Sequence, residues 1–204
     1  MISQSNNPLI KDLVNRLRDI RITPKEFRHN LKLLAQLLCM EACSFPLTKQ
    51  IIPTWIGQKE FSFIEQENIV VVAILRAALP MQEGLLELFP YARGGFLAMK
   101  RDESTFEAKL YYTRLPDIEG KNLIVVDPMV ATGGSLKSAL DILAAKKPAS
   151  ITTLHVVGVK DGLEYVNASH PNAHIHIAQI DAYLNEQKYI IPGLGDAGDR
   201  AFHT

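Results

Sequence analysis

The chain has little of what marks a membrane, secreted or strongly charged protein. Two of its 204 residues are cysteine, too few for a disulfide framework. Its 22 basic and 22 acidic side chains cancel, so no net positive charge favours nucleic acid. No apolar run approaches the roughly 18 residues that a membrane span needs. The start of the chain also lacks the charged and apolar regions of a secretion signal. These absences predict a soluble, cytoplasmic protein that binds neither membranes nor nucleic acid.

The two cysteines, Cys39 and Cys43, lie four residues apart in a helical pattern and therefore share one helix face. They are either a redox pair or small core residues in a reducing cytosol.

What the chain does contain is the composition of an ordinary globular protein. Hydrophobic residues make up 47% of it, and 12 glycines and 11 prolines are close to the average content. The length predicts one domain over residues 1–204. Within it we distinguish N-terminal helices and an arm (1–66), a core (67–180) and a tail (181–204).

The N-terminal part predicts two helices followed by an extended arm. Asn7 before Pro8 is typical of a helix start, and Thr23-Pro24-Lys25-Glu26 has the form of a capping box. Apolar residues follow each of them at helical spacing. Residues 45–66 consist of short β-prone pieces broken by proline and glycine, which predicts a hairpin or arm outside the core. Such an arm suggests a partner subunit.

Residues 69–180 alternate between apolar β-branched runs and helix-like stretches. Ile69–Leu75 is a continuous apolar run, typical of a strand buried on both faces. The other expected strands are 96–99, 110–113, 123–126, 151–157 and 174–180, and the expected helices are 81–88, 138–145 and a stretch after 161. This alternation predicts a parallel α/β sheet, in which ligands lie beyond the carboxyl ends of the strands.

The segment 123–135, Leu-Ile-Val-Val-Asp-Pro-Met-Val-Ala-Thr-Gly-Gly-Ser, carries the clearest chemical signal. A buried strand ends at Asp127, and a small-residue turn then opens a helix. Two glycines after Thr132 let backbone N–H groups approach an anion, and the hydroxyls of Thr132 and Ser135 add donors. Asp127 could accept hydrogen bonds from sugar hydroxyls beside that anion; alternatively it is a cap in an ordinary turn. Neither a Walker motif nor a dinucleotide fingerprint is present.

This segment resembles the phosphoribosyl-diphosphate loop of type I phosphoribosyltransferases, and its Asp-Pro-Met variant resembles the uracil branch of that family. Two more stretches agree: Ile-Leu-Arg-Ala at 74–77, with Arg-Asp-Glu at 101–103, and Tyr-Ile-Ile-Pro-Gly-Leu-Gly-Asp-Ala-Gly-Asp-Arg at 189–200. The resemblance covers essentially the whole chain. It implies a type I phosphoribosyltransferase-like parallel sheet flanked by helices, with a C-terminal base-binding segment.

The resemblance implies pyrimidine salvage, in which uracil and 5-phosphoribosyl 1-diphosphate (PRPP) give UMP and diphosphate. Charge separates between the ribose ring and the departing diphosphate, so the protein must position the reactants and stabilise that charge. Mg²⁺ is expected to arrive with the diphosphate, since no carboxylate cluster able to hold it is visible. Activation by GTP is allowed by resemblance to some relatives, and the arm predicts a homodimer or higher homo-oligomer.

The resemblance also assigns roles to individual residues. Those expected to bind PRPP are Arg76, Arg101, Asp127, Pro128, Met129, Val130, Ala131, Thr132, Gly133, Gly134, Ser135 and Asp196. Those expected to bind uracil, mainly through backbone groups, are Ile190, Gly195, Asp196 and Ala197. Asp127, facing the ribose hydroxyls, and Asp196, between base and sugar, are the expected catalytic residues. Either arginine could instead be structural, Arg76 as a strand-end cap and Arg101 as a solvated charge.

Some positions depart from the usual family pattern. Ala78 and Pro80 stand where glycines are typical, Lys160 where proline is common, and His203 where the chain usually ends with glycine. Because alanine disfavours positive φ, Ala78 leaves the backbone shape near the diphosphate open.

Several alternatives stay open at this stage. The same fold could serve an RNA-binding pyrimidine regulator, although zero net charge and an intact tail speak against it, or a non-catalytic nucleotide-binding relative. His174 and His176 alternate on one strand face and could pair on a metal. The charged segment 102–107 is either a flexible hood over the site or a solvated loop.

Overall fold

The computed structural model describes the backbone of residues 1–101 and 108–204. Within these residues, eight strands form a central sheet in the order β1-β10-β9-β7-β4-β5-β6, and β8 pairs with β9 beside this path. The strands are β1 (Ile2–Gln4), β4 (Ile69–Leu75), β5 (Arg93–Arg101), β6 (Ala108–Arg114), β7 (Asn122–Val126), β8 (Met129–Val130), β9 (Ser150–Val159) and β10 (His174–Asp181). Two small two-stranded sheets stand apart: β2 (Leu47–Thr54) with β3 (Gly57–Ile64), and β11 (Tyr183–Leu184) with β12 (Ile190–Ile191).

The sheet is mostly parallel, which confirms the predicted fold class. In the sheet order β1-β10-β9-β7-β4-β5, each strand runs parallel to its neighbours. Strand β6 is an antiparallel edge strand beside β5. Two predicted strands, 69–75 and 123–126, correspond to β4 and β7 almost residue for residue. Strand β1 was not predicted, because three residues are too few to show an alternating pattern; it pairs with β10 through Ile2 and Ile175.

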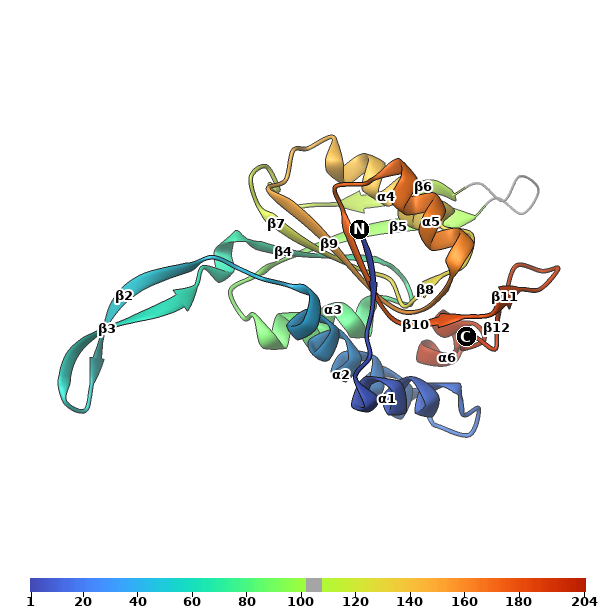
Figure 1. The fold of residues 1–204 in the computed structure, drawn as a ribbon, viewed down its shortest axis with the longest axis horizontal. Helices are drawn as coiled ribbons and strands as arrows, with labels where there is room; N and C mark the ends of the chain where they lie inside the picture. Colours follow the sequence, from blue (N-terminus) through green and yellow to red (C-terminus); the bar gives the residue numbers. More distant parts are fainter. Residues whose placement is uncertain (102–107) are drawn as a thin grey trace.

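Helices cover both faces of the sheet (Figure 1). Helices α1 (Pro8–Arg18), α2 (Pro24–Ala42) and α3 (Leu79–Leu88) lie on one face, and α4 (Gly134–Ala144) and α5 (Lys160–Ser169) lie on the other. Helix α6 (Ala197–Phe202) closes the chain near α1 and α2, and a short 3-10 helix spans Gln66–Asn68. Strand β4 serves both layers, because alternate side chains of a strand point to opposite faces. Val71 packs in the cluster with α1–α3, and Val72 packs in the cluster with α4 and α5.

The predicted helix starts are confirmed in atomic detail. The side-chain oxygen of Asn7 accepts a hydrogen bond from the backbone N–H of Leu9 at 3.0 Å. Thr23 and Glu26 form the reciprocal capping box, with the Glu26 carboxylate 2.7 Å from the backbone nitrogen of Thr23. Farther along α2, Cys39 is buried and Cys43 partly buried, and both are free thiols. Their mutual hydrogen bond and then burial raise the pKa of Cys39, as suits a core residue.

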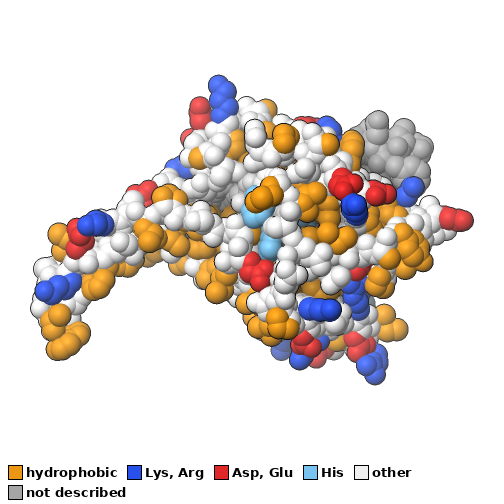
Figure 2. All heavy atoms as spheres, in the orientation of Figure 1, with side chains coloured by type: hydrophobic (Ala, Val, Ile, Leu, Met, Phe, Trp, Pro, Cys, Tyr) orange, Lys and Arg blue, Asp and Glu red, His pale blue; other side chains and the backbone are white. Residues whose placement is uncertain are grey.

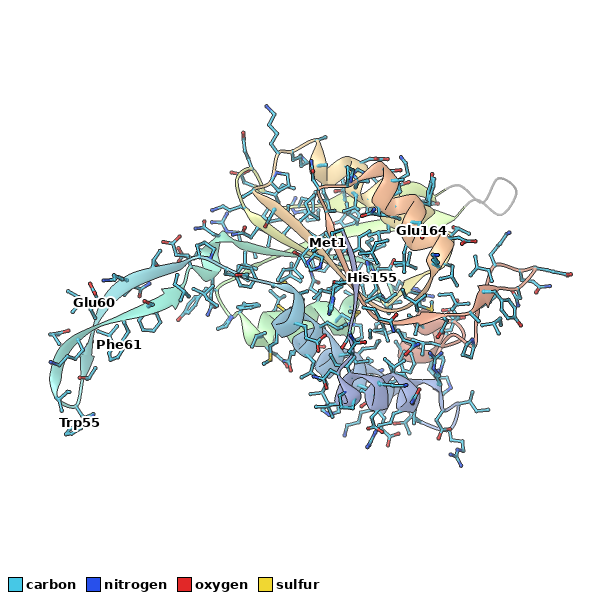
Figure 3. The ribbon with its side chains drawn as sticks, in the orientation of Figure 1. Met1, Trp55, Glu60, Phe61, His155 and Glu164 are labelled. Atoms are coloured by element: carbon cyan, nitrogen blue, oxygen red, sulfur yellow. The ribbon has the colours of Figure 1, made fainter. Side chains whose placement is uncertain are left out.

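The predicted arm is confirmed as a hairpin of β2 and β3 that projects away from the body (Figure 1). Apolar side chains lie along it and at its tip (Figure 2), where Trp55 is 95% exposed. Phe61 and Phe63 are also exposed on β3. Figure 3 shows Trp55 at the end of the turn and Phe61 part-way along the arm.

His174 and His176 have a structural partner in β1. Each places a ring nitrogen 2.8 Å from the hydroxyl of Ser3, and the other ring nitrogen of His176 lies 3.1 Å from Glu41. In the part of the chain that the structure describes, no three histidine, cysteine or acidic side chains gather where they could hold a metal. These hydrogen bonds fasten β1 to β10. Among the described helices, none has the length and apolar character to cross a membrane.

The burial of α2 gives a direct test of this packing. Leu34 is fully buried in the core, whereas Met40 on the same helix is 74% exposed. We expect Leu34→Ala to lower the free energy of unfolding by about 2–5 kcal/mol, because it removes buried methyl groups and leaves a cavity. Met40→Ala should change it by less than about 0.5 kcal/mol. Chemical denaturation of both variants makes the comparison, and equal losses would contradict the assignment of the buried face.

Candidate functional site

One cavity joins the segment after β7 to the C-terminal tail. Its volume is about 430 Å³. It is lined by Asp127 and residues 129–136 on one side, and by residues 187–190, Gly195 and Asp196 on the other. Segments 123–135 and 189–200, which carry the sequence resemblance, therefore meet at a single site beyond the carboxyl end of β7, as expected for a parallel sheet.

The loop before α4 is shaped for close contact between backbones. Gly133 has a φ of +81°, and a Cβ atom there would overlap the carbonyl oxygen of Gly162 at the start of α5. A Cβ atom on Gly162 would in turn overlap the carbonyl of Ala131. The two glycines let α5 support the loop directly. Gly134 and Ser135, in the first turn of α4, line the cavity at the positive end of the helix, a geometry that favours anions.

Pro128 is buried and fixes the loop to the sheet. Its carbonyl oxygen accepts hydrogen bonds from the backbone nitrogens of Val156 and Val157, each at 3.0 Å. Pro128 does not line the cavity, whereas the other predicted loop residues do. Its predicted contact with PRPP stays a prediction.

Asp127 is partly buried where β7 ends. Its carboxylate accepts a hydrogen bond from the backbone N–H of Met129 at 3.3 Å. Loss of solvent raises the pKa of Asp127 to about 7, and the hydrogen bond from Met129 opposes this shift. The group is thus poised between its neutral and ionised forms near neutral pH.

The side chain of His155 forms a hydrogen bond with the backbone of Asp127. The sequence analysis did not assign His155 to the site. Its Nδ1 lies 2.7 Å from the carbonyl oxygen of Asp127, and its Nε2 lies 2.8 Å from the hydroxyl of Thr153. Because a carbonyl can only accept, Nδ1 carries the proton and the Thr153 hydroxyl donates to Nε2. The ring is fully buried near the centre of the molecule (Figure 3), and burial lowers the pKa of His155 to about 4.

The tail turns sharply between β12 and α6. Gly193 and Gly195 have φ values of +62° and +71°, which glycine adopts without strain. Ile190, Gly195 and Asp196, three of the residues predicted to bind the base, line the cavity. Ala197 is fully buried and does not line it. One oxygen of Asp196 accepts a hydrogen bond from the backbone N–H of Asp199 at 2.9 Å and so caps α6.

Arg76 follows β4 and lies beside the tail, not in the lining of the cavity. Its guanidinium is 3.2 Å from the carboxylate of Asp199 and 3.3 Å from the hydroxyl of Thr204. The side chain is 58% exposed, so it remains open to a ligand. The side chain of Arg101 and the segment 102–107 lie outside the described part of the structure.

The departures from the family pattern fit the backbone. Ala78 has a φ of −78° at the start of α3, so no positive φ is required there. His203 does adopt a left-handed conformation, with a φ of +58°, at the end of α6. Lys160 begins α5 and lies 3.6 Å from Glu164. The backbone shape that the sequence left open at Ala78 is therefore right-handed helical.

Four more residues that line the cavity were not assigned from sequence. Leu136 lines it from α4, and Gln187, Lys188 and Tyr189 line it from the segment before β12. Lys188 has a φ of +64°, which no local pattern predicts for a lysine.

Comparison with known proteins matches residues 4–204 to the family model described as uracil phosphoribosyltransferase. The chain belongs to the uracil phosphoribosyltransferase family. A curated uracil phosphoribosyltransferase from Aquifex aeolicus is 40% identical over 203 residues, covering 99% of this chain and 98% of the relative. A solved structure of an Aquifex aeolicus protein, also 40% identical, superposes with a TM-score of 0.96 over 99% of this chain and 98% of its own.

A hypoxanthine phosphoribosyltransferase from Trypanosoma cruzi shares the fold alone, at 16% identity and a TM-score of 0.50 over 79% of each chain. The phosphoribosyltransferase architecture predicted from the three sequence blocks is thereby confirmed. The roles assigned to individual residues remain predictions.

Asp127 generates a pH-dependent prediction. Only the ionised carboxylate is a strong acceptor for ribose hydroxyls, and the ionised fraction rises as pH passes about 7. We expect kcat/KM for PRPP to rise across this range, because this quantity reports ionisation of the free enzyme. Asp127→Asn should lower turnover by roughly a hundredfold and abolish this rise.

Protein stability provides the control for the same variant. Because the folded-state pKa lies above the ordinary value of 3.8, ionising Asp127 lowers stability progressively as pH rises from about 4 through 7. Asp127→Asn should therefore equal the parent in stability near pH 3.5 and exceed it near pH 8.5. Parent-like turnover in a folded Asp127→Asn variant would contradict the role of Asp127.

Proposed function

We propose that this protein transfers the phosphoribosyl group from PRPP to uracil and releases diphosphate. The observation that carries the proposal is the shared cavity, in which the anion-binding loop before α4 faces Ile190, Gly195 and Asp196 of the tail. A phosphate held at one end and a base held at the other would place the ribose between them, beside Asp127. Uracil phosphoribosyltransferases at 40% identity over nearly the full chain support the same reaction.

Each part of the cavity has a task in this scheme. Backbone N–H groups at Gly133 and Gly134 and the hydroxyl of Ser135 hold the 5-phosphate. Asp127 orients the ribose through its hydroxyls. Uracil presents an acceptor, a donor and an acceptor along one edge, which backbone groups near Ile190 and Gly195 can match without a charged side chain. The reaction needs no protein nucleophile, so catalysis rests on position and electrostatics.

We propose that Mg²⁺ enters bound to the diphosphate of PRPP. The donor set fits this role, because the carboxylates lining the cavity are Asp127 and Asp196, two groups that can complete but not build a magnesium site. Bound there, the ion would neutralise charge on the leaving group.

We assign Arg76, which follows β4 and lies beside the tail, to that leaving group. Its planar guanidinium can donate two parallel hydrogen bonds to a diphosphate once it exchanges Asp199 for the ligand. The same role for Arg101 rests on the sequence resemblance.

This arrangement predicts different effects of Arg76 on two ligands. Arg76→Ala should weaken PRPP binding by about tenfold or more, because a charged hydrogen-bond donor is lost. UMP, which lacks the diphosphate, should bind within about threefold of the parent. Calorimetric titration of the two ligands measures both affinities. Equal losses for both would assign Arg76 to the structure of the tail instead.

We propose that the arm holds a second copy of the chain in a homodimer or higher homo-oligomer. A two-stranded hairpin is marginally stable by itself in water, and this one exposes Trp55, Phe61 and Phe63. Full burial of one such side chain against a partner subunit contributes about 1.5–3 kcal/mol to the free energy of association.

The arm can be tested without touching the cavity. The Phe61→Ser, Phe63→Ser double variant should shift the protein towards monomer in sedimentation equilibrium, whereas Gln58→Ser on the same strand should leave the mass of the parent unchanged. A parent that is monomeric at every concentration, or a double variant with the mass of an oligomeric parent, would contradict the proposal.

We also propose that GTP activates the enzyme and that the protein is cytoplasmic. The proposal of activation rests on the sequence resemblance alone. Measuring initial rates of UMP formation with and without GTP tests it. The free thiols of Cys39 and Cys43 suit the reducing cytosol.

The activity itself is tested by following UMP formation from uracil and PRPP with Mg²⁺, with cytosine, thymine and orotate as control bases. We expect UMP from uracil and little product from the controls. Binding of PRPP and UMP without turnover would indicate a non-catalytic relative. Filter binding of RNA at several salt concentrations tests the regulatory alternative.

A further inference from the structure

Two carbonyl groups in the tail, between the residues that we assign to the base, accept hydrogen bonds from arginine side chains. Ile190 lies before this pair and Gly195 after it, and the carbonyl oxygens of Gly193 and Leu194 lie between them in the chain. The carbonyl of Gly193 accepts a hydrogen bond from Arg18 at 2.7 Å. The carbonyl of Leu194 accepts one from Arg200 at 2.8 Å.

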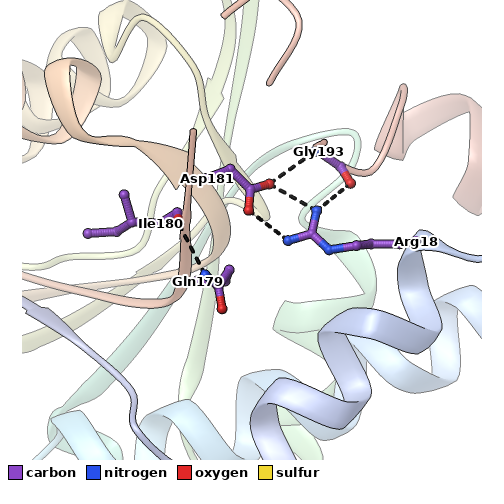
Figure 4. A network of polar contacts seen from close by, with 5 residues as sticks. All are labelled: Arg18, Gln179, Ile180, Asp181 and Gly193. Carbon is purple, nitrogen blue, oxygen red and sulfur yellow. Dashed lines mark hydrogen bonds and ion pairs between the residues drawn. The ribbon is translucent and has the colours of Figure 1, made fainter. Parts of the chain in front are cut away.

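Arg18, Asp181 and Gly193 form a closed network (Figure 4). The guanidinium of Arg18, at the end of α1, donates to both carboxylate oxygens of Asp181 at 2.7 and 2.9 Å. Asp181, at the end of β10, accepts a further hydrogen bond from the backbone N–H of Gly193 at 2.9 Å. Gly193 is thus held at its nitrogen by Asp181 and at its oxygen by Arg18. We call these three residues the bracket.

The bracket is shielded from solvent. The side chain of Asp181 is 3% exposed and that of Arg18 is 20% exposed. Charge-assisted hydrogen bonds with this geometry are roughly twice as strong as neutral ones. The peptide groups on both sides of Gly193 are therefore fixed more firmly than a glycine-rich loop would be by itself.

Arg200 makes the reciprocal connection from the tail back to α1. Its guanidinium donates to the carbonyls of Leu17 at 2.5 Å and Asp19 at 2.7 Å and lies 4.5 Å from the centre of the Phe27 ring. Arg18 thus reaches from α1 to the backbone of the tail, and Arg200 reaches from the tail to the backbone at the end of α1. The end of α1 and the tail segment are fastened together by side chains and not by strand pairing.

A movement of Gly193 would reach the residue that faces the base. A Cβ atom at Gly193 would overlap the carbonyl oxygen of Ile190, so these two backbones are in close contact. A change in the backbone at Gly193 would therefore press on Ile190, which lines the cavity. The bracket holds this peptide in one orientation.

The opposite end of the cavity has separate supports. The phosphate loop is held by β9, through the carbonyls of Pro128 and Asp127, and by the close packing of Gly162 on Ala131. None of these contacts includes a bracket residue. The contacts that hold the phosphate loop thus use other residues than the bracket, although β9 and β10 are neighbours in the sheet and Asp181 pairs in register with Val159.

We propose that Arg18 and Asp181 are positioning residues that set the affinity of the cavity for the base and leave the affinity for PRPP largely unchanged. They act through the backbone of Gly193 and Ile190 and do not touch the substrate. The proposal rests on the proposed function, in which the tail binds uracil.

The decisive experiment compares two arginines of α1 that lie half a turn apart. Arg16 forms a surface pair with Asp12 and is 65% exposed, so Arg16→Met is the matched control. In Arg18→Met we expect the KM for uracil to rise by about tenfold or more, since two charged hydrogen-bond partners are lost. The KM for PRPP should stay within about threefold, and Arg16→Met should behave like the parent.

Two milder variants keep the test valid if Arg18→Met does not fold, as judged by thermal unfolding. Arg18→Lys retains the charge but not the planar fork, and we expect a smaller rise in the KM for uracil. Asp181→Asn retains the shape but exchanges one acceptor for a donor, and it should resemble Arg18→Met.

The outcomes separate this proposal from the proposed function. A parent enzyme that makes no UMP would overturn the function, whatever the variants do. Given an active parent, a selective rise in the KM for uracil supports the bracket. A similar rise in both KM values, or a loss of thermal stability with both unchanged, would overturn it and leave Arg18 and Asp181 a purely structural pair.

Discussion

The double burial of β4 and its neighbours is the constraint on which the rest of the structure depends. A strand with apolar side chains on both faces requires a layer of helices on each side, and parallel strands direct their carboxyl ends to one edge. Asp127 after β7, Arg76 after β4 and Asp181 at the end of β10 follow this rule. They come from distant parts of the sequence, yet the sheet delivers them to the same side of the molecule.

Electrostatics at that edge depend on backbone dipoles more than on charged side chains. The described lining contains the carboxylates of Asp127 and Asp196 and the ammonium of Lys188, a modest set for a ligand with several phosphate charges. The positive end of α4 and the N–H groups around Gly133 provide attraction that needs no counterion and cannot be titrated. Burial raises the pKa of Asp127 to about 7, so under the proposed function its contact with the ribose would depend on pH.

Features that depend on neighbouring residues in the sequence were predicted, and features that depend on contacts between distant residues were not. The strands 69–75 and 123–126 and the cap at Thr23 were predicted because their patterns are local. The role of His155 was not, because a buried histidine shows its hydrogen-bond partner only in three dimensions. The pair of Arg18 and Asp181 joins residues 163 positions apart, and neither belongs to a recognisable motif.

The two ends of the cavity differ in what holds them, and this has a consequence for specificity. The loop before α4, where we propose that phosphate binds, is held by backbone contacts with β9 and α5 and by the side chain of His155. The tail, where we propose that the base binds, is held by the side chains of Arg18, Asp181 and Arg200, each of which a single substitution can change. Under the proposed function, substitutions at these positions would alter recognition of the base without contacting it. The contacts that single side-chain substitutions can adjust thus lie at the end of the cavity that we assign to the base.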